Sequence, residues 1–315
     1  MKKLTKKEAE GISDNYCLGK VESLKIFPKG LVNYNYDLKT DRGNFVVRIL
    51  GHKMDRLKKE KIKLEFDVLN FLAKSDFEYK TPLPIKNKKG NFVTELKDKD
   101  FWVYEKIKGI AIRGKIKDKK IFNLVKALAT YHKTVKKFKF DRKFDNEEWV
   151  LEKFVELRKV VPKNNIDRLM LENLDFFEDA LMKMLKKKFV KNLIPTHSDF
   201  HKNNALFKGS EVVAMLDFDN LQIGPRVKDV AYFIKQNCFR NSKFDKDLFK
   251  KILKEYEKTS KLSKEEKDMI IPLIIKDNCQ TFWWFYAEMK KGLDKRELLL
   301  RWTIDTTKNL VEELK

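Results

Sequence analysis

The sequence contains little cysteine, no long apolar run and few acidic residues for its number of basic ones. Its three cysteines, Cys17, Cys238 and Cys279, are far apart in the chain. We therefore expect no cysteine metal cluster, and we expect a reducing, cytoplasmic location. The apolar run at residues 269–275 contains a proline and is far too short to span a bilayer, which argues against membrane insertion. The basic start, MKKLTKKEAEG, has no apolar stretch behind it, so we expect no secretory signal.

The shortage of acidic residues leaves a formal net charge of +23, from 70 Lys and Arg against 47 Asp and Glu. Such a charge can indicate a nucleic acid or an anionic membrane as partner. Here the excess is spread along the chain, in segments such as RLKKEKIK, KIKDKK and MLKKKF. Most of these interleave with apolar positions at helical spacing, as solvated helix faces do. The distribution therefore disfavours nucleic acid as a partner.

The chain is nevertheless rich enough in apolar residues to fold. Hydrophobic residues make up 42% and aromatic residues 12% of its 315 residues. A chain of this length can form one large domain or two lobes, each with its own core. Composition supports no prediction of oligomeric state.

The most informative stretch is residues 193–219, LIPTHSDFHKNNALFKGSEVVAMLDFD. A short apolar run leads into the polar loop 197–204. A second apolar run, a Gly-containing turn and a third apolar run follow, which is the pattern of a β-hairpin. The pattern places Asp199 and Asn204 on a loop before the hairpin and Asp217 where the hairpin ends.

This set of side chains suits phosphoryl transfer from ATP. That reaction needs one carboxylate facing the attacking hydroxyl, and an Asn and a further carboxylate to hold Mg²⁺ on the phosphates. The spacing H-x-D-x-x-x-x-N, followed by an Asp after a hairpin, is filled by His197, Asp199, Asn204 and Asp217. A loop rich in Asx and His for turn reasons alone is the competing interpretation. Asp219 is left open between holding the metal, contacting substrate and facing solvent.

The stretch resembles the aminoglycoside phosphotransferase, choline kinase and homoserine kinase type II superfamily, whose loop usually reads H-G-D-x-H-P-x-N. His201, two residues after Asp199, separates this group from protein kinases, which usually carry Lys there. The segment IGPRVKDVAYF also resembles the family's segment after the metal-binding Asp, and no A-P-E motif follows Asp217. Within this segment we interpret Asp229 as structural, either as a cap of the following helix or as a brace of the loop that carries Asp199. Elsewhere in the chain, we interpret His132 as a core residue.

The resemblance runs from about residue 20 to 290 and implies a bilobal, protein-kinase-like α+β fold. Residues 1–107 would form a small N-terminal nucleotide-binding lobe around an antiparallel sheet. Residues 108–315 would form a larger, mainly helical C-terminal lobe for catalysis and substrate binding. Asp199 would then be the catalytic base, His197 would brace its loop, and Asn204 and Asp217 would bind the metal.

The N-terminal region predicts strands at 21–27, 32–38 and 44–50 and an amphipathic helix at 59–73. The turn from Gly30 through Asn33 resembles the family's G-x-x-N-x-x-Y turn. Its backbone N–H groups and the Asn33 side chain would contact phosphate oxygens, although an ordinary hairpin turn is an alternative. Arg48 occupies the strand position where kinases keep a phosphate-binding Lys. Its implied partner is Glu65, with Glu60 as second choice.

A further predicted hairpin, 91–96 with 100–107, runs into the position of the kinase hinge. The resemblance implies that backbone groups there bind the adenine edge while apolar side chains enclose the ring. The residues concerned are Tyr104, Glu105, Lys106 and Ile107.

Together these features predict an ATP- and Mg²⁺-dependent kinase that phosphorylates a hydroxyl of a small molecule. Homoserine, an amino sugar or aminoglycoside, a choline-like compound and a sugar all remain open as acceptors. Acidic groups in the C-lobe cleft would favour a cationic acceptor, and a Lys or Arg aimed at a carboxylate would favour homoserine. The aromatic segment 277–288 is either a pocket wall for a cation or a helix packed in the core.

A nucleotide-binding regulatory protein with little catalytic activity is the alternative function. It is motivated by the departures from the family pattern: Arg48 in place of Lys, Lys202-Asn203 in place of Pro-Gly, and few glycines in the phosphate loop.

Overall fold

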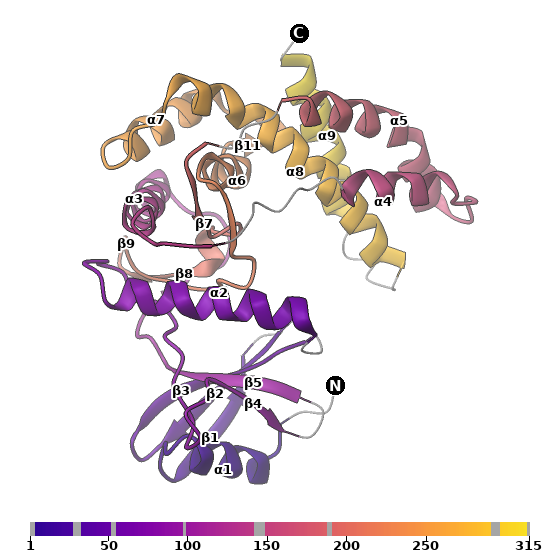
Figure 1. The fold of residues 1–315 in the computed structure, drawn as a ribbon. Coiled ribbons are helices and arrows are strands. Elements are labelled where there is room, and N and C mark those ends of the chain that lie inside the picture. Colours follow the sequence, from indigo (N-terminus) through magenta and orange to yellow (C-terminus); the bar gives the residue numbers. More distant parts are fainter. Residues whose placement is uncertain are drawn as a thin grey trace. The chain divides into compact units, whose positions relative to one another are not determined.

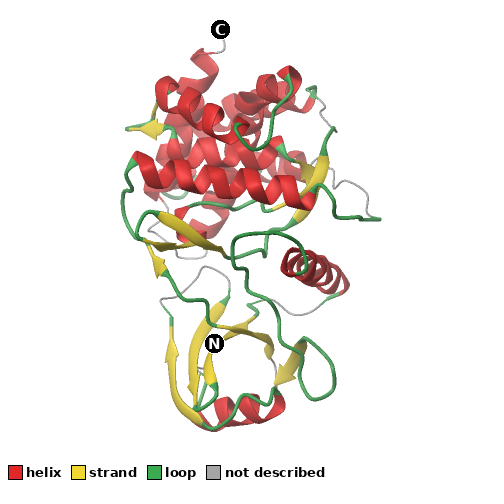
Figure 2. Ribbon diagram, turned by 90° about the vertical axis from the view of Figure 1, so that its left-hand side faces the viewer, coloured by secondary structure: helices red, strands yellow, loops and turns green. Residues whose placement is uncertain are grey.

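The computed structural model describes residues 4–27, 33–51, 55–96, 99–141, 149–187, 191–290 and 297–313. The chain forms two compact units, whose elements are drawn in Figures 1 and 2. The first comprises Met1–Lys115 with Lys202–Leu221, and the second Ile116–His201 with Gln222–Lys315. The lobe boundary between residues 107 and 108 stays a prediction. The compact units divide after Lys115 and assign the hairpin segment Lys202–Leu221 to the first unit.

The first unit is built on a five-stranded antiparallel sheet with the order β1-β2-β3-β5-β4. A second sheet has the order β6-β8-β9. The elements are α1 (Lys6–Asn15), β1 (Val21–Ile26), β2 (Tyr34–Thr40), β3 (Gly43–Ile49), α2 (Arg56–Ala73), β4 (Val93–Leu96), β5 (Lys99–Glu105), β6 (Ile110–Ala111), η1 (Lys202–Asn204), β8 (Ala205–Lys208) and β9 (Glu211–Met215). The predicted antiparallel sheet is confirmed. Each helix begins at a side-chain cap, Thr5 for α1 and Asp55 for α2.

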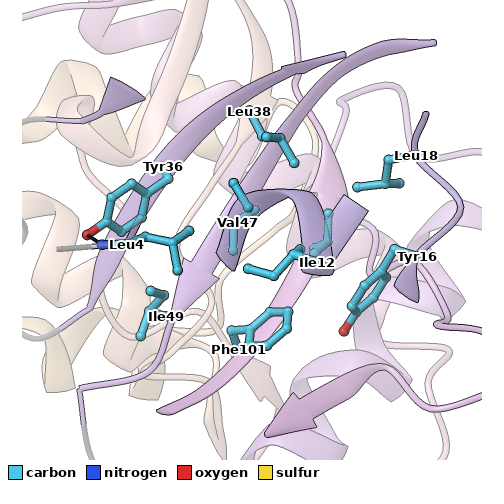
Figure 3. Packing of buried hydrophobic residues seen from close by; sticks show 11 residues of the cluster. Leu4, Ile12, Tyr16, Leu18, Tyr36, Leu38, Val47, Ile49 and Phe101 are labelled. Atoms are coloured by element: carbon cyan, nitrogen blue, oxygen red, sulfur yellow. Dashed lines mark hydrogen bonds between the residues drawn. The ribbon is translucent and has the colours of Figure 1, made fainter. Parts of the chain in front are cut away.

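The five-stranded sheet has two faces because side chains alternate along a strand. Phe101 and Val103 join an apolar cluster with Ile12 of α1 (Figure 3). Trp102 points to the other face, where its ring lies 5.3 Å from that of Phe66 on α2. Arg48 is the cross-strand neighbour of Trp102 and shares this second face. The alternation therefore separates an apolar face under α1 from a face that carries a buried charge.

The second unit is mainly helical, as predicted. Its elements are α3 (Asp118–Val135), α4 (Trp149–Arg158), α5 (Asn165–Leu185), β7 (Leu193–Thr196), β10 (Gln222–Pro225), α6 (Val227–Asn237), β11 (Phe239–Arg240), β12 (Lys243–Phe244), α7 (Lys246–Glu257), α8 (Lys264–Lys290) and α9 (Glu297–Glu313). The long helix α8 packs against α4, α5, α6 and α9 (Figure 1). Phe282 of α8 stacks on Phe177 of α5, with ring centroids 4.1 Å apart. At this position the aromatic segment packs in the core, as one of its two interpretations predicts.

The described residues can be compared with the expectations for membrane-spanning helices and for the cysteines. None of the described helices combines the length and the apolar character that a bilayer crossing requires. Cys17 is exposed, Cys238 and Cys279 are buried, and all three are free thiols. The cytoplasmic location stays a prediction.

Replacing each of two glycines in the first unit by alanine should change its stability in opposite directions. A Cβ on Gly109 would lie 2.7 Å from Cβ of Leu206 and 3.1 Å from Val213 on the β8–β9 hairpin, whereas a Cβ on Gly11 in α1 meets nothing within 4 Å. We expect Gly109→Ala to lower the free energy of unfolding by about 1–3 kcal/mol because the contact must open. Gly11→Ala should raise it by about 0.5–1 kcal/mol through helix propensity. Urea denaturation of both variants measures this, and equal effects of the two would contradict the packing.

Candidate active site

The predicted metal ligands lie at one end of the β8–β9 hairpin. Asn204 directly precedes β8, and Asp217 follows β9 by two residues. The antiparallel register pairs Ala205 with Met215, and Leu216 N donates a hydrogen bond to Asn204 O at 2.8 Å. The ladder therefore brings together two residues that are 13 positions apart in sequence. Asp217 has a φ of 64°, a left-handed conformation that turns the chain sharply as it leaves the strand.

Arg48 is the buried charge beside this hairpin end. Its Nη2 lies 2.7 Å from Asp217 Oδ1 and 2.6 Å from Asp219 Oδ2, and its side chain is 6% exposed. The predicted pairing with Glu65 stays a prediction: the charge of Arg48 lowers the pKa of Glu65, while the close ion pairs of the guanidinium are those with the two aspartates. Glu65 Oε1 and Arg48 Nε are each buried without a hydrogen-bond partner among the described residues.

Three carboxylates surround this one guanidinium, so the cluster carries excess negative charge. Burial, and then the charge of Asp219, raise the pKa of Glu65 to about 8, against the lowering effect of Arg48. Burial alone would lower the pKa of Arg48, but Asp219, Asp217 and Glu65 hold it well above its ordinary value. A cluster with this balance and with oxygen donors suits a hard divalent cation such as Mg²⁺.

The protein alone offers few ligands for such a cation. Within the described ranges, no three His, Cys, Asp or Glu residues are grouped to hold a metal ion. Mg²⁺ commonly binds one or two protein ligands and completes its shell with phosphates and water. Asn204 and Asp217 fit that pattern, and the buried, unpartnered Glu65 Oε1 fits a cluster short of positive charge.

Asn33 joins the same cluster from the start of β2. Its side-chain amide donates to Asp219 Oδ2, and its Oδ1 accepts a hydrogen bond from Gly51 N at 3.0 Å. The carboxylate of Asp219 thus points toward both Arg48 and Asn33. The phosphate-loop residue Gly30 lies outside the described residues.

The predicted adenine-binding segment begins in β5, which contains Tyr104 and Glu105, and continues past its end. Lys106 N donates to Asn44 O at 2.8 Å, and its ammonium pairs with Asp37 at 2.6 Å, so Lys106 is engaged within the sheet. Because backbone polar groups alternate in direction along a strand, Glu105 directs its own away from β3. Tyr104 is buried beside Trp102, with ring centroids 5.1 Å apart, and burial raises its pKa to about 12.

In the second unit, a buried carboxylate holds the start of the loop 197–204, which carries Asp199. Asp229, in the first turn of α6, accepts hydrogen bonds from His197 N at 2.8 Å and Ser198 N at 2.7 Å. It also lies 2.9 Å from Nε2 of His132 on α3, whose Nδ1 lies 2.7 Å from the hydroxyl of Tyr256. Burial raises the pKa of Asp229, but His132, His197 and Ser198 outweigh it and leave the pKa below its ordinary value.

Asp229 braces the loop that carries Asp199, which is one of the two structural roles that the sequence allows it. His132 is buried, as expected of a core residue, and it pairs with Asp229, a contact that the sequence does not reveal. Ser198, at the position where the family pattern has Gly, has a φ of 62°. The signal available in the sequence was a Ser at the loop position where the family pattern has Gly, together with the Asp of IGPRVKDVAYF.

Asp199 itself is oriented by two neighbours in the second unit. The hydroxyl of Tyr232, on α6, donates to Asp199 Oδ1, and His201 Nε2 lies 3.6 Å from the same oxygen. Burial, and then the charge of Asp199, raise the pKa of Tyr232 well above its ordinary value, so it acts as a neutral donor. The sequence analysis did not identify Tyr232. His197 is completely buried at the start of the loop.

With this geometry established, known proteins can be compared. Residues 23–260 match the sequence model of the phosphotransferase enzyme family. The homoserine kinase of Neisseria meningitidis serogroup B is 24% identical over 278 residues, which cover 88% of this chain and 86% of that protein.

Solved structures share the fold over nearly the whole chain. A microcompartment-associated aminopropanol kinase has a TM-score of 0.71 at 14% identity, covering 96% of this chain and 97% of its own. An amicoumacin kinase in complex with AMP-PNP and Ca²⁺ has a TM-score of 0.69 at 15% identity, covering 97% of both chains. Spectinomycin phosphotransferase with ADP has a TM-score of 0.64 at 13% identity, covering 99% and 98%. The predicted kinase-like α+β fold is confirmed.

The raised pKa of Glu65 predicts a pH-dependent stability. Protonated Glu65 supports the fold fully below its ordinary pKa of 4.5, and this support is lost as the pH rises through about 8. In nucleotide-free protein, Glu65→Gln should therefore gain stability over the wild type between pH 5 and 8.5, by on the order of 2 kcal/mol. Urea titrations at both pH values measure the gain. Glu60→Gln, on the same helix but exposed, is the control, and an equal pH response of the two variants would contradict the assignment.

The lowered pKa of Asp229 predicts the opposite pH dependence. Its ionised form contributes stability above the ordinary carboxyl pKa, and this contribution is lost as the pH falls below about 4. Asp229→Asn should cost about 2–4 kcal/mol at neutral pH because buried donors lose a charged acceptor. The difference from the wild type should narrow on acidification. Thermal unfolding from pH 7 to 3 tests this, with the exposed Asp247→Asn as control; a gap that persists at pH 3 would refute it.

Proposed function

Because this chain belongs to the phosphotransferase enzyme family and is a small-molecule kinase, we propose that it transfers the γ-phosphoryl group of ATP, with Mg²⁺, to a hydroxyl of a small acceptor. The observation that supports this most is the pairing of Asn204 and Asp217 at one hairpin end, beside the buried Arg48. A small-molecule partner rather than nucleic acid, and a cytoplasmic location, belong to the same proposal.

The first unit would bind the nucleotide. The backbone groups of Glu105, directed away from β3, and those of Ile107 would bind the adenine edge. Arg48 would exchange part of its contact with the aspartates for phosphate oxygens, which its planar fork suits. Asn204 and Asp217 would hold Mg²⁺, and the bound ion neutralises charge on the phosphates.

The second unit would supply the base. Tyr232 and His201 orient the Asp199 carboxylate through Oδ1, and the acceptor hydroxyl gives its proton to Oδ2. The acceptor oxygen forms a bond to the γ-phosphorus, the bond from that phosphorus to the β–γ bridging oxygen breaks, and ADP leaves. Asp229 keeps the loop backbone in place during the reaction through its hydrogen bonds to His197 and Ser198.

One observation favours the competing role of a nucleotide-binding regulatory protein. Asp217, the proposed metal ligand, is engaged by Arg48, so binding of the ion must compete with an ion pair. A catalytic test separates the two functions, since both predict nucleotide binding and only the kinase predicts turnover.

Replacement of the proposed base provides that test. Asp199→Asn should lower the rate of ADP release by about 10²–10⁴-fold, because a positioned base contributes that much. Its affinity for ATP should stay close to that of the wild type. Both are measured with Mg-ATP and a panel of homoserine, choline, ethanolamine, aminoglycosides, amino sugars and simple sugars.

Asp247→Asn, an exposed change of the same kind on α7, is the matched control and should leave turnover unchanged. Retained turnover in Asp199→Asn would refute its role as base. ATP binding by the wild type without acceptor-dependent ADP release would favour the regulatory role.

A further inference from the structure

A series of hydrogen bonds leads from the residue before α6 to the carboxylate of Asp229. Arg226 donates from Nη1 to Ser260 Oγ at 2.7 Å. The hydroxyl of Ser260 forms a hydrogen bond with that of Tyr256, which lies 2.7 Å from His132 Nδ1. His132 Nε2 in turn lies 2.9 Å from Asp229 Oδ2. These five residues, from α6, α7, α3 and the segment after α7, form what we call the Arg226–Asp229 network.

The charges at its two ends give the network one direction. Asp229 is ionised and only accepts, so Nε2 of His132 carries the proton that is donated to it. Nδ1 is then the acceptor of a neutral imidazole, and Tyr256 donates its hydroxyl hydrogen to it. Tyr256 accepts from Ser260, which accepts from the cationic Arg226. In the reverse order the hydroxyl hydrogen of Ser260 would meet a guanidinium, which has no acceptor.

The cationic end of the network is fixed by further contacts. Arg226 Nε lies 2.6 Å from Glu266 Oε1 and its Nη2 lies 2.8 Å from Glu266 Oε2, which makes a bidentate pair with a completely buried residue of α8. Nη2 also donates to Lys261 O. A guanidinium held in this way cannot rotate, so Nη1 stays directed at Ser260. A lysine ammonium lacks the planar fork that satisfies Glu266 and Ser260 together.

The network also closes through the backbone of α6. Asp229 N donates to Arg226 O at 3.1 Å, so the two ends of the network lie one helical turn apart. The carboxylate is therefore located both by its own helix and by side chains of α3 and α7. The same carboxylate accepts from His197 N and Ser198 N, directly before Asp199. The position of the Asp199 backbone thus depends on the network.

We infer that Arg226 and Tyr256 are positioning residues for phosphoryl transfer: by holding His132 in the tautomer with a proton on Nε2, they keep Asp229 and the backbone before Asp199 in place. The inference rests on the proposed role of Asp199 as base. Tyr256 is completely buried and acts only through His132. A displacement of about 1 Å, caused far from the reacting atoms, is enough to lower a rate by about 10²-fold.

The tautomer is measured directly by NMR of the full-length protein labelled with ¹⁵N-histidine. The sequence contains four histidines, so the signals of His132 are identified by their loss in His132→Gln. At neutral pH and without nucleotide, we expect a protonated Nε2 and an unprotonated Nδ1. Tyr256→Phe should shift the Nδ1 signal because this nitrogen loses its donor. Ser260→Ala and Arg226→Lys should shift it in the same direction by less.

Turnover measures the consequence for catalysis. With Mg-ATP and the acceptor of the panel that the wild type uses best, Tyr256→Phe and Arg226→Lys should each lower kcat for ADP release by about 10-fold. KM for ATP should stay unchanged, because the proposed nucleotide contacts belong to the first unit. Ser260→Ala should lower kcat less, and Ser260→Thr should restore it because the hydroxyl is retained. Thr259→Ala removes a neighbouring hydroxyl outside the network, and as matched control it should alter neither kcat nor the Nδ1 signal.

Thermal unfolding of each variant separates a loss of fold from a loss of positioning. Lower kcat and shifted Nδ1 signals, in variants that stay folded at the assay temperature, would support the inference. Unchanged kcat in folded Tyr256→Phe and Arg226→Lys would show a purely structural role and overturn it, as would a protonated Nδ1 in the wild type. Absence of acceptor-dependent ADP release in the wild type would contradict the proposed function, while the Nδ1 signals would still decide whether the network sets the tautomer.

Discussion

The arrangement of the second unit depends on one buried carboxylate. Asp229 accepts hydrogen bonds from two consecutive backbone N–H groups of the loop that carries Asp199, and it pairs with the imidazole of His132. A buried charge is tolerated only when its hydrogen bonds are satisfied, so the loop is held where these donors can reach the carboxylate. The same helix presents Tyr232, three residues further on, to Asp199. One helix therefore fixes both the backbone of the loop and the orientation of the Asp199 carboxylate.

The first unit carries a local charge imbalance. Three carboxylates surround the single guanidinium of Arg48, and burial, followed by the charge of Asp219, raises the pKa of Glu65. Such an imbalance lowers stability while a site is empty, and a ligand of opposite charge relieves it. The excess of carboxylates over cationic groups in this cluster suits a divalent cation.

Contacts between residues close in the sequence were predicted from it, whereas contacts between distant residues were not. Asn204 and Asp217 are joined by a hairpin, a local structure that short-range patterns reveal, and the helical and strand segments were predicted for the same reason. The contacts of Arg48 are of longer range. The spacing identified Glu65 on the right helix, but it does not tell which of three carboxylates the guanidinium contacts. His132 and Asp229 are 97 residues apart, so their pairing depends on tertiary packing and could not be predicted from short-range sequence patterns.

The three thiols differ sharply in their surroundings. Cys17 follows α1 in the first unit and is exposed, while burial raises the pKa of both Cys238 and Cys279 in the second unit. The thiolate is the reactive form, so a maleimide reagent should attach to Cys17 in the native protein and spare the other two. The unmodified chain thus offers a single labelling position for a fluorophore in its first unit. The two protected thiols become reactive when the helices around them open, so the rate of their labelling reports the local unfolding of the second unit.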